Sequence, residues 1–232
     1  MELKDPDFRT GFDSVVMLTA SDWKSEPRSN RFHYATRFAA AGIRVIFVQH
    51  DRSEGHAFEP SGVAGIEILH VPERFGPAQA AVIAEALAQR RVLRPLLWIY
   101  SANYIDTIER IHAPVRVLHA TEDYFSPELR RQQQPGFYDR LSRLFGRLDL
   151  LVAVSEGVLA SYRQEGGYRG EALLLENGCD YKAIRAVVEA LPPEEADGAP
   201  VAFYQGGINY RLDFALLLEL ARSRPDWVFE YC

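Results

Sequence analysis

The chain has 232 residues, of which 47% are hydrophobic, and a formal net charge of −6. This apolar content suffices for a packed core, and the acidic balance argues against a general nucleic-acid binder, which needs a basic surface. The two cysteines, Cys179 and Cys232, lack the spacing of metal ligands or of a disulfide framework. The polar N-terminus and the absence of long apolar runs predict a cytoplasmic protein without a signal peptide or membrane span, and we expect no metal or cofactor.

Short apolar runs alternate with helical patterns along residues 1–188. Runs this short, rich in Val and Leu, are typical of strands buried on both faces of a parallel sheet. The predicted strands are 15–19, 43–48, 66–71, 96–100, 115–119, 150–154 and 173–175. Helices are expected from Ser29 or Asn30, from Pro77, and over 104–111 and 136–148, with 51–65 irregular. This order predicts an α/β fold with a doubly wound, mostly parallel Rossmann-like sheet.

A second, smaller unit is predicted after residue 199. Residues 189–199 are acidic and contain two prolines, which indicates a linker. A strand at 201–204, a helix at 212–222 and a strand at 227–231 follow. Because one βαβ unit cannot build a core of its own, we expect a domain in 1–188, a linker in 189–199 and, in 200–232, the start of a truncated second α/β domain. The chain is then a fragment of a longer protein.

Two adjacent acids, Glu122 and Asp123, follow the strand at 115–119. Catalytic groups collect at the carboxyl edge of parallel sheets, so these acids are candidates for a general base, although they could equally cap the next segment. The loop that contains Asn103 and Tyr104 is expected to line the same crevice. His119, at the end of the strand, is interpreted as a half-buried histidine with satisfied hydrogen bonds.

Basic residues gather at the start of the first predicted helix. Arg28, Arg31 and His33 either bind an anionic acceptor or form a solvated helix end. Two further groups of arginines either contact anionic lipid or, as we prefer, form exposed charged faces. These are Arg90, Arg91 and Arg94, and Arg140, Arg143 and Arg147.

Two short motifs suggest other chemistries. Residues 153–157, with Ser155 at the centre, resemble the nucleophile elbow of hydrolases, but no histidine follows to complete a triad, so Ser155 is better interpreted as a helix N-cap. Gly206 and Gly207 lie between a predicted strand and helix, where backbone amides can approach a phosphate. The glycine fingerprint of nucleotide-cofactor oxidoreductases is absent, which disfavours that class.

The order of three segments carries a family resemblance. They are Asp149-Leu-Leu-Val-Ala-Val-Ser-Glu156, Glu176-Asn-Gly-Cys-Asp180 and Phe203-Tyr-Gln-Gly-Gly207. Together with residues 23–33, 211–213 and 223–229, they resemble the two-domain GT-B glycosyltransferases close to families 4 and 1. The resemblance extends over most of residues 14–231.

The resemblance implies transfer of a sugar from a nucleotide-sugar donor to a glycan or lipid-linked acceptor, in polysaccharide or cell-envelope glycan biosynthesis. The first domain would hold the acceptor, through Arg28, Arg31, His33, Asn103 and Tyr104. The second domain and the adjoining loops would hold the donor, through Ser155, Glu156, Asn177, Gly206, Gly207 and Arg211. Glu122 takes the place of the first acid of a related subgroup and is favoured over Asp123 as the base. The alternative is a non-catalytic fragment that binds sugar or nucleotide without turnover.

Overall fold

The computed structural model describes residues 11–25, 29–191, 198–208 and 212–232. The chain divides into two compact units, Met1–Gly178 and Cys179–Cys232. This division falls earlier than the predicted linker at 189–199, and the domain boundaries expected from the sequence stay a prediction.

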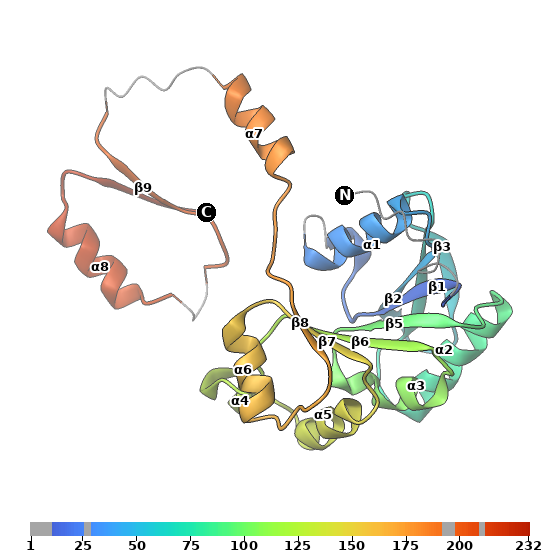
Figure 1. Ribbon diagram of the computed structural model, residues 1–232. Coiled ribbons are helices and arrows are strands. Elements are labelled where there is room, and N and C mark those ends of the chain that lie inside the picture. The colour runs from blue at the N-terminus through green and yellow to red at the C-terminus, as the bar shows by residue number, and fades with distance from the viewer. Residues whose placement is uncertain (1–10, 26–28, 192–197, 209–211) are drawn as a thin grey trace. The chain divides into compact units, whose positions relative to one another are not determined.

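The first unit is built on an eight-stranded sheet with the strand order β3-β4-β2-β1-β5-β6-β7-β8 (Figure 1). Its strands are β1 (Ser14–Leu18), β2 (Val45–Arg52), β3 (Ala57–Pro60), β4 (Ile66–Pro72), β5 (Pro95–Ile99), β6 (Val115–Ala120), β7 (Leu150–Ala153) and β8 (Ala172–Leu174). Every neighbouring pair is parallel except β3 with β4. The predicted doubly wound α/β fold and its seven parallel strands are therefore confirmed.

The prediction that residues 51–65 are irregular is wrong in part. Strand β2 continues to Arg52, and residues Ala57–Pro60 form β3, antiparallel to β4 at the edge of the sheet. An edge strand of four residues that ends in Glu59 and Pro60, both exposed, has no apolar alternation to reveal it.

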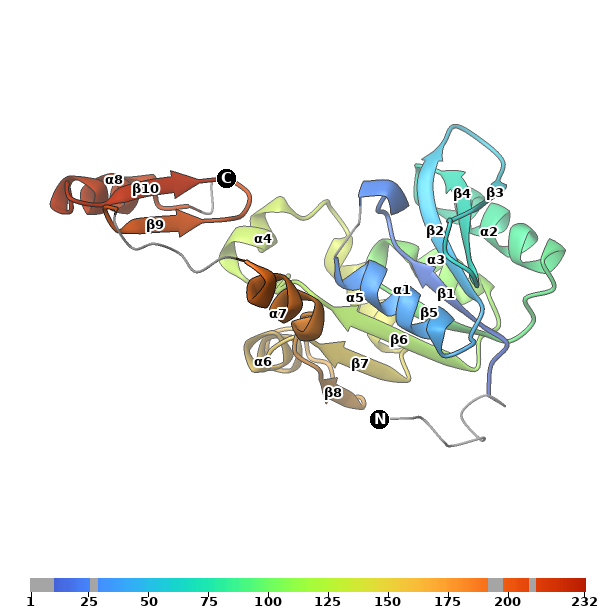
Figure 2. The ribbon, with the colours of Figure 1, turned by 90° about the horizontal axis from the view of Figure 1, so that it is seen from above.

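Helices cover both faces of this sheet (Figure 2). They are α1 (Asn30–Ala40), α2 (Pro77–Gln89), α3 (Ile105–Arg110), α4 (Pro127–Gln132), α5 (Phe137–Phe145) and α6 (Glu156–Gln164), with short 3-10 turns at Trp23–Ser25 and Ala102–Tyr104. Helix α1 packs on the face that carries Met17 and Trp98. Helices α2, α3, α5 and α6 contribute to the core on the other face, with Leu18 and Leu97. Because successive strand residues point to opposite faces, the central strands β1, β2 and β5 supply both cores.

Local signals in the sequence set the helix starts. The hydroxyl of Ser29 accepts from the amide of Phe32 at 3.3 Å and caps α1. Pro77 occupies the first turn of α2, where its missing amide costs nothing. Both predicted starts are confirmed. Helix α4, with only six residues, was not expected.

The second unit contains α7 (Tyr181–Ala190), β9 (Val201–Tyr204), α8 (Phe214–Ser223) and β10 (Val228–Tyr231). Strands β9 and β10 form a separate parallel pair. Helix α8 begins two residues later than predicted, because the carboxylate of Asp213 accepts from the amide of Leu216 at 3.0 Å and caps it.

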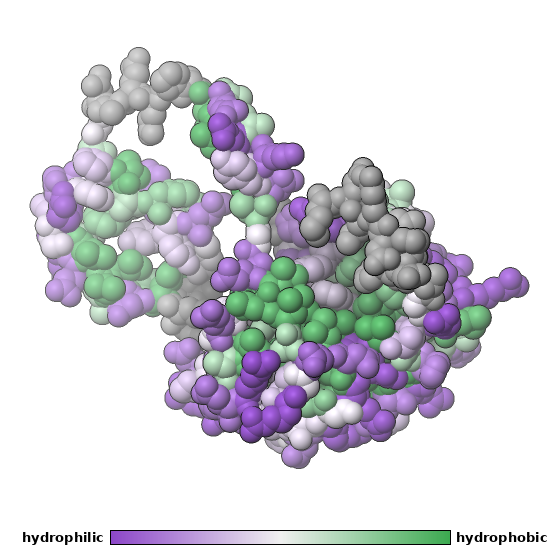
Figure 3. Space-filling model, in the orientation of Figure 1, coloured by the Kyte–Doolittle hydropathy of each residue, from purple (hydrophilic) through white to green (hydrophobic). Residues whose placement is uncertain are grey.

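Apolar side chains of the second unit reach the surface of this chain (Figure 3). Phe203 is 60% exposed and Phe214 is 55% exposed, and none of the described residues beyond Cys179 is buried. Among the described residues, no helix is both long enough and apolar enough to cross a membrane.

Candidate active site at the carboxyl edge of the sheet

The sheet has a topological switch point between β1 and β5. Strand β1 lies between β2 and β5. The chain leaves β1 toward α1 on one face, and it leaves β5 toward α3 on the other. In open α/β sheets, ligands bind in the crevice that forms where such connections diverge. Strand β6 is the next neighbour, so the loops after β1, β5 and β6 border one part of the carboxyl edge.

An arginine, a tyrosine and a histidine meet at this point. The Cζ atom of Arg31, in the first turn of α1, lies 4.9 Å from the centre of the Tyr100 ring, just beyond β5. The Tyr100 hydroxyl lies 3.3 Å from Nδ1 of His119, in β6. Three elements thus bring one cation and two polar aromatic side chains together.

His119 is uncharged at neutral pH. Burial lowers the pKa of this imidazole from 6.5 to about 4, and the charge of Arg31 acts in the same direction. The residue is 1% exposed, and its Nε2 atom makes no hydrogen bond within the described part of the chain. The interpretation of His119 as half-buried and satisfied is therefore wrong. The rings of Tyr34 and Trp98 pack edge-on against it, with ring centres 4.8 Å and 5.5 Å away, and contribute to its burial.

The two adjacent acids have different environments. Both oxygens of Asp123 accept hydrogen bonds: Oδ1 from the amide of Phe125 at 3.1 Å, and Oδ2 from the hydroxyl of Ser161 at 3.0 Å. Glu122 is half-buried, and its charge adds to burial in raising the pKa of Tyr124, whereas Arg31 opposes that shift. Glu122 and Arg31 therefore both lie close enough to Tyr124 to influence its ionisation.

Asn103 and Tyr104 use their side-chain polar atoms for contacts within the protein. Tyr104 is completely buried, and its hydroxyl donates to the carbonyl of Thr19 at 2.5 Å and lies 2.5 Å from Nε2 of His50. The side-chain oxygen of Asn103 accepts from Arg140 of α5 at 3.0 Å. These contacts fix the loops after β1 and β5 to their surroundings.

The other predicted residues of the first unit are dispersed. His33 is half-buried beside Phe32, with the two ring centres 6.0 Å apart. Ser155 caps α6 by accepting from the amide of Val158 at 3.2 Å, and Glu156 and Asn177 are exposed. The N-cap interpretation of Ser155 is confirmed.

The two glycines of the second unit differ. The amide of Gly206 donates to the carbonyl of Cys232 at 2.9 Å, which extends the pairing of β9 with β10. The carbonyl of Gly207 accepts from the hydroxyl of Tyr204 at 3.5 Å. Arg28 and Arg211 lie outside the described residues.

The predicted basic faces carry intramolecular partners. Arg143 donates to Glu109 at 2.6 Å, and Arg147 lies 3.8 Å from the same carboxylate. Arg90 lies 3.3 Å from Glu67. These pairs favour exposed charged faces over contact with anionic lipid.

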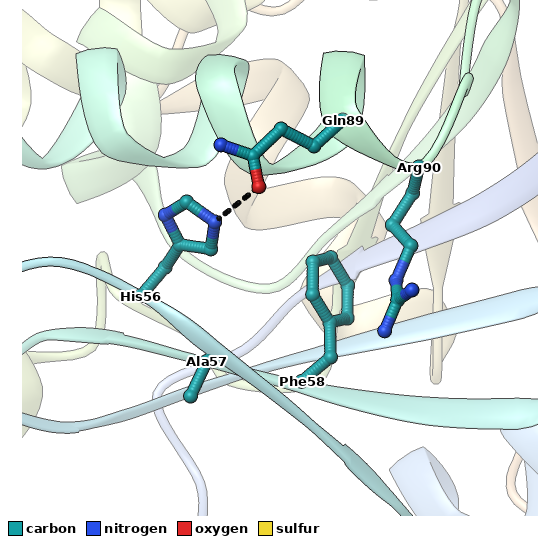
Figure 4. A pocket seen from close by; sticks show the side chains of 5 residues that line it. All are labelled: His56, Ala57, Phe58, Gln89 and Arg90. Carbon is teal, nitrogen blue, oxygen red and sulfur yellow. Dashed lines mark hydrogen bonds between the residues drawn. The ribbon is translucent and has the colours of Figure 1, made fainter.

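Two cavities lie away from the switch point. One of about 330 Å³ lies between β3 and the end of α2 (Figure 4). There His56 Nε2 lies 3.1 Å from Gln89 Oε1, and Arg90 covers the ring of Phe58. The other, of about 260 Å³, lies among α4, α5 and α6 and is lined by Phe125 and Tyr138. Neither holds any of the predicted site residues.

Tyr100 and Ser161 are site residues that the sequence did not reveal. Tyr100 ends a predicted strand, which is the only signal that it lies at the carboxyl edge. Ser161 is an ordinary helix residue 38 positions after Asp123, and no local pattern predicts that contact.

The fold is similar to that of the GT-B glycosyltransferases, with an eight-stranded Rossmann-like sheet followed by a smaller α/β unit. No protein-family profile matches the chain, and no curated protein matches it in sequence. The likeness is one of structure.

Three solved structures illustrate this likeness. Sucrose-phosphate synthase from Thermosynechococcus elongatus has a TM-score of 0.62 at 11% identity over 94% of this chain and 70% of its own. The α,α-trehalose 6-phosphate synthase from Burkholderia multivorans has 0.62 at 10% identity, over 94% and 64%. HepE from Anabaena, in complex with UDP and glucose, has 0.60 at 12% identity, over 94% and 60%. The chain spans less than two thirds of the last two proteins.

Proposed function

We propose that this chain is the acceptor-side domain, with the beginning of the donor-side domain, of a glycosyltransferase that uses a nucleotide sugar. The observation that carries the proposal is the cluster of Arg31, Tyr100 and His119 beside the switch point of a GT-B-like sheet. Glu122 and Asp123 follow directly after β6, the strand that holds His119. One carboxylate and one cation at a binding crevice suit a reaction in which an acceptor hydroxyl must be deprotonated and held.

The chemistry assigns different tasks to the two acids. The acceptor oxygen forms a bond to the anomeric carbon, the bond from that carbon to the donor phosphate breaks, and the nucleoside diphosphate leaves with the electron pair. Glu122 accepts the proton of the acceptor hydroxyl. Asp123 is assigned a positioning role, because both of its oxygens accept hydrogen bonds that hold the loop.

The acceptor is proposed to be a glycan or a lipid-linked glycan with an anionic group. Arg31 supplies a guanidinium at the crevice, and arginine pairs well with phosphate or carboxylate. Arg28 and His33 are proposed to extend this contact, while Asn103 and Tyr104 shape the wall. The proposed setting is polysaccharide or cell-envelope glycan biosynthesis on the cytoplasmic side.

The donor is proposed to meet the residues inferred from the family resemblance. They are Ser155, Glu156, Asn177, Gly206, Gly207 and Arg211. Because the Gly206 amide is engaged with Cys232, Gly207 is the glycine proposed to approach the donor phosphates. HepE binds UDP and glucose, so UDP-sugars are the first donors to test.

The second candidate is a non-catalytic protein that binds sugar or nucleotide. It is favoured by the exposed apolar surface of the second unit, in which no described residue beyond Cys179 is buried.

Donor-dependent turnover separates the two. The complete protein should be incubated with UDP-, GDP- and ADP-sugars, with binding followed by thermal stabilisation and turnover by release of the nucleoside diphosphate. We expect the sugars of one nucleotide class to raise Tm. Even without an acceptor, the protein should slowly transfer this sugar to water and release the nucleoside diphosphate. If the nucleotide sugar raises Tm but no nucleoside diphosphate is released when glycan and lipid-linked acceptors are present, the binding protein is favoured. If there is neither a rise in Tm nor release, both candidates are contradicted.

A further inference from the structure

The loop between β6 and α4 is fixed by two neighbouring helices. The hydroxyl of Tyr138, from α5, donates to the carbonyl of Tyr124 at 2.6 Å. The hydroxyl of Ser161, from α6, donates to Asp123 at 3.0 Å. Within the loop, the amide of Ser126 donates to the Asp123 carbonyl at 3.0 Å. The two residues after Glu122 are therefore each held by a hydrogen bond from a helix.

Packing strengthens the connection to α6. Phe125 is 5% exposed, and its ring lies edge-on to Tyr162, with centres 5.3 Å apart. A methyl group at Gly166 would come within 2.5 Å of the Phe125 ring and 2.7 Å of the Tyr162 carbonyl. Glycine is thus needed just beyond α6 for Phe125 to occupy its place.

The Asp123 carboxylate is the central point of this arrangement. One of its oxygens closes the turn through the amide of Phe125, and the other accepts from Ser161. Fixing this side chain onto α6 sets the direction in which the preceding side chain, Glu122, leaves the loop. A reacting group that is held in the productive geometry reacts faster than one that is held loosely.

We infer that Ser161 and Asp123 form a positioning pair that holds Glu122 toward the acceptor, an inference that rests on the proposed function. Neither residue touches the substrate: Ser161 orients Asp123, and Asp123 orients the loop. The pair also joins the β6–α4 loop to α6, the helix that Ser155 caps at the carboxyl edge of the sheet.

The test is a set of variants in the complete protein. Ser161→Ala removes the hydroxyl and should lower kcat about 10- to 100-fold, with KM for the donor unchanged, because geometry rather than binding is lost. Ser161→Thr keeps a hydroxyl and should restore kcat. The double variant Asp123→Ala/Ser161→Ala should lose no more than Asp123→Ala alone, since the two side chains act through one bond. Ser142→Ala, at an exposed serine of α5, is the matched control and should be normal.

A measurement independent of activity accompanies these rates. Amide exchange at Phe125 should be faster in Ser161→Ala than in the parent and should return to the parent rate in Ser161→Thr. If Ser161→Ala melts below the assay temperature, Ser161→Cys, which keeps the volume but is a weak donor, replaces it with the same expected loss.

The outcomes separate the two claims. If kcat and Phe125 exchange are both normal in Ser161→Ala while Glu122→Gln is inactive, the positioning pair is overturned and the proposed function stands. An active Glu122→Gln variant contradicts Glu122 as the base and, with it, the role of the pair, whereas a parent protein without donor-dependent turnover contradicts the proposed function.

Discussion

The two sheets of this chain are built from the same kind of unit but differ in burial. In the eight-stranded sheet, β1 and β5 are buried throughout, because helices cover both faces. In the two-stranded sheet, β9 and β10 contain no buried residue, and α8 is the one helix among the described residues between them. A βαβ unit forms a core only when both faces of its strands are covered. The defined geometry of the candidate site therefore belongs to the first sheet.

The largest expected difference between the two units is in how much the free energy of unfolding falls when a leucine is replaced by alanine. Leu97, in β5, is completely buried, and Leu97→Ala should lower the free energy of unfolding by about 2–5 kcal/mol. Leu218, in α8, is 51% exposed, and Leu218→Ala should change it by less than about 0.5 kcal/mol. Urea denaturation followed through Trp98 in the first unit and Trp227 in the second measures each transition. Equal effects would contradict the contrast in burial.

The pH dependence of stability should also belong to the first sheet. Since the pKa of His119 falls from 6.5 to about 4 on folding, the unfolded chain binds the proton more readily. Stability should be fully present above pH 6.5 and should decrease as the pH falls toward 4, by up to about 3 kcal/mol. His50, whose pKa burial also lowers to about 4, acts in the same direction.

Two histidine variants isolate this effect. His119→Gln should flatten the decrease in urea midpoint between pH 6.5 and 4, whereas His112→Gln, at an exposed histidine, should leave it unchanged. An unaltered slope in His119→Gln would show that the buried imidazole does not titrate on unfolding.

Two glycines sharpen the comparison further. Gly166→Ala would place a methyl group 2.7 Å from a backbone carbonyl and 2.5 Å from the Phe125 ring, and it should cost about 1–3 kcal/mol. Gly206→Ala meets the far end of the Tyr204 side chain at 2.7 Å, which can rotate away at little cost. Thermal melting of both variants is the measurement, and an equally large loss at Gly206 would indicate that the second unit is as tightly packed as the first.

The smallest expected effect is at the helix caps. Ser155→Ala removes the acceptor for the Val158 amide and should cost about 1 kcal/mol in the first transition. Asp213→Ala removes the cap of α8 and should affect only the second transition. If Ser155→Ala also weakens donor binding under conditions in which the variant is fully folded, this result would support the proposed contact of Ser155 with the donor.

The sequence predicted the parallel strands well because each is a short apolar run, and β1 and β5 are buried throughout. It missed β3, whose Glu59 and Pro60 read as loop, and α4, which is too short to show periodicity. For the site, the position of the acids after β6 was predictable from strand polarity. Their different surroundings were not, because these depend on a hydrogen bond between Asp123 and Ser161 that joins distant parts of the chain. The burial of His119 likewise depends on Tyr34, on a different element.

The most direct test of the account compares Glu122→Gln with Asp123→Asn in the complete protein, with turnover and donor binding measured on the same samples. We predict that Glu122→Gln loses about 10²–10⁴ in kcat with nearly normal folding and donor binding, since a general base contributes a factor of this size. Asp123→Asn, which keeps an oxygen to accept a hydrogen bond, should lose less. Full activity of Glu122→Gln with an inactive Asp123→Asn would contradict the assignment of the base, and full activity of both would remove this loop from the chemistry.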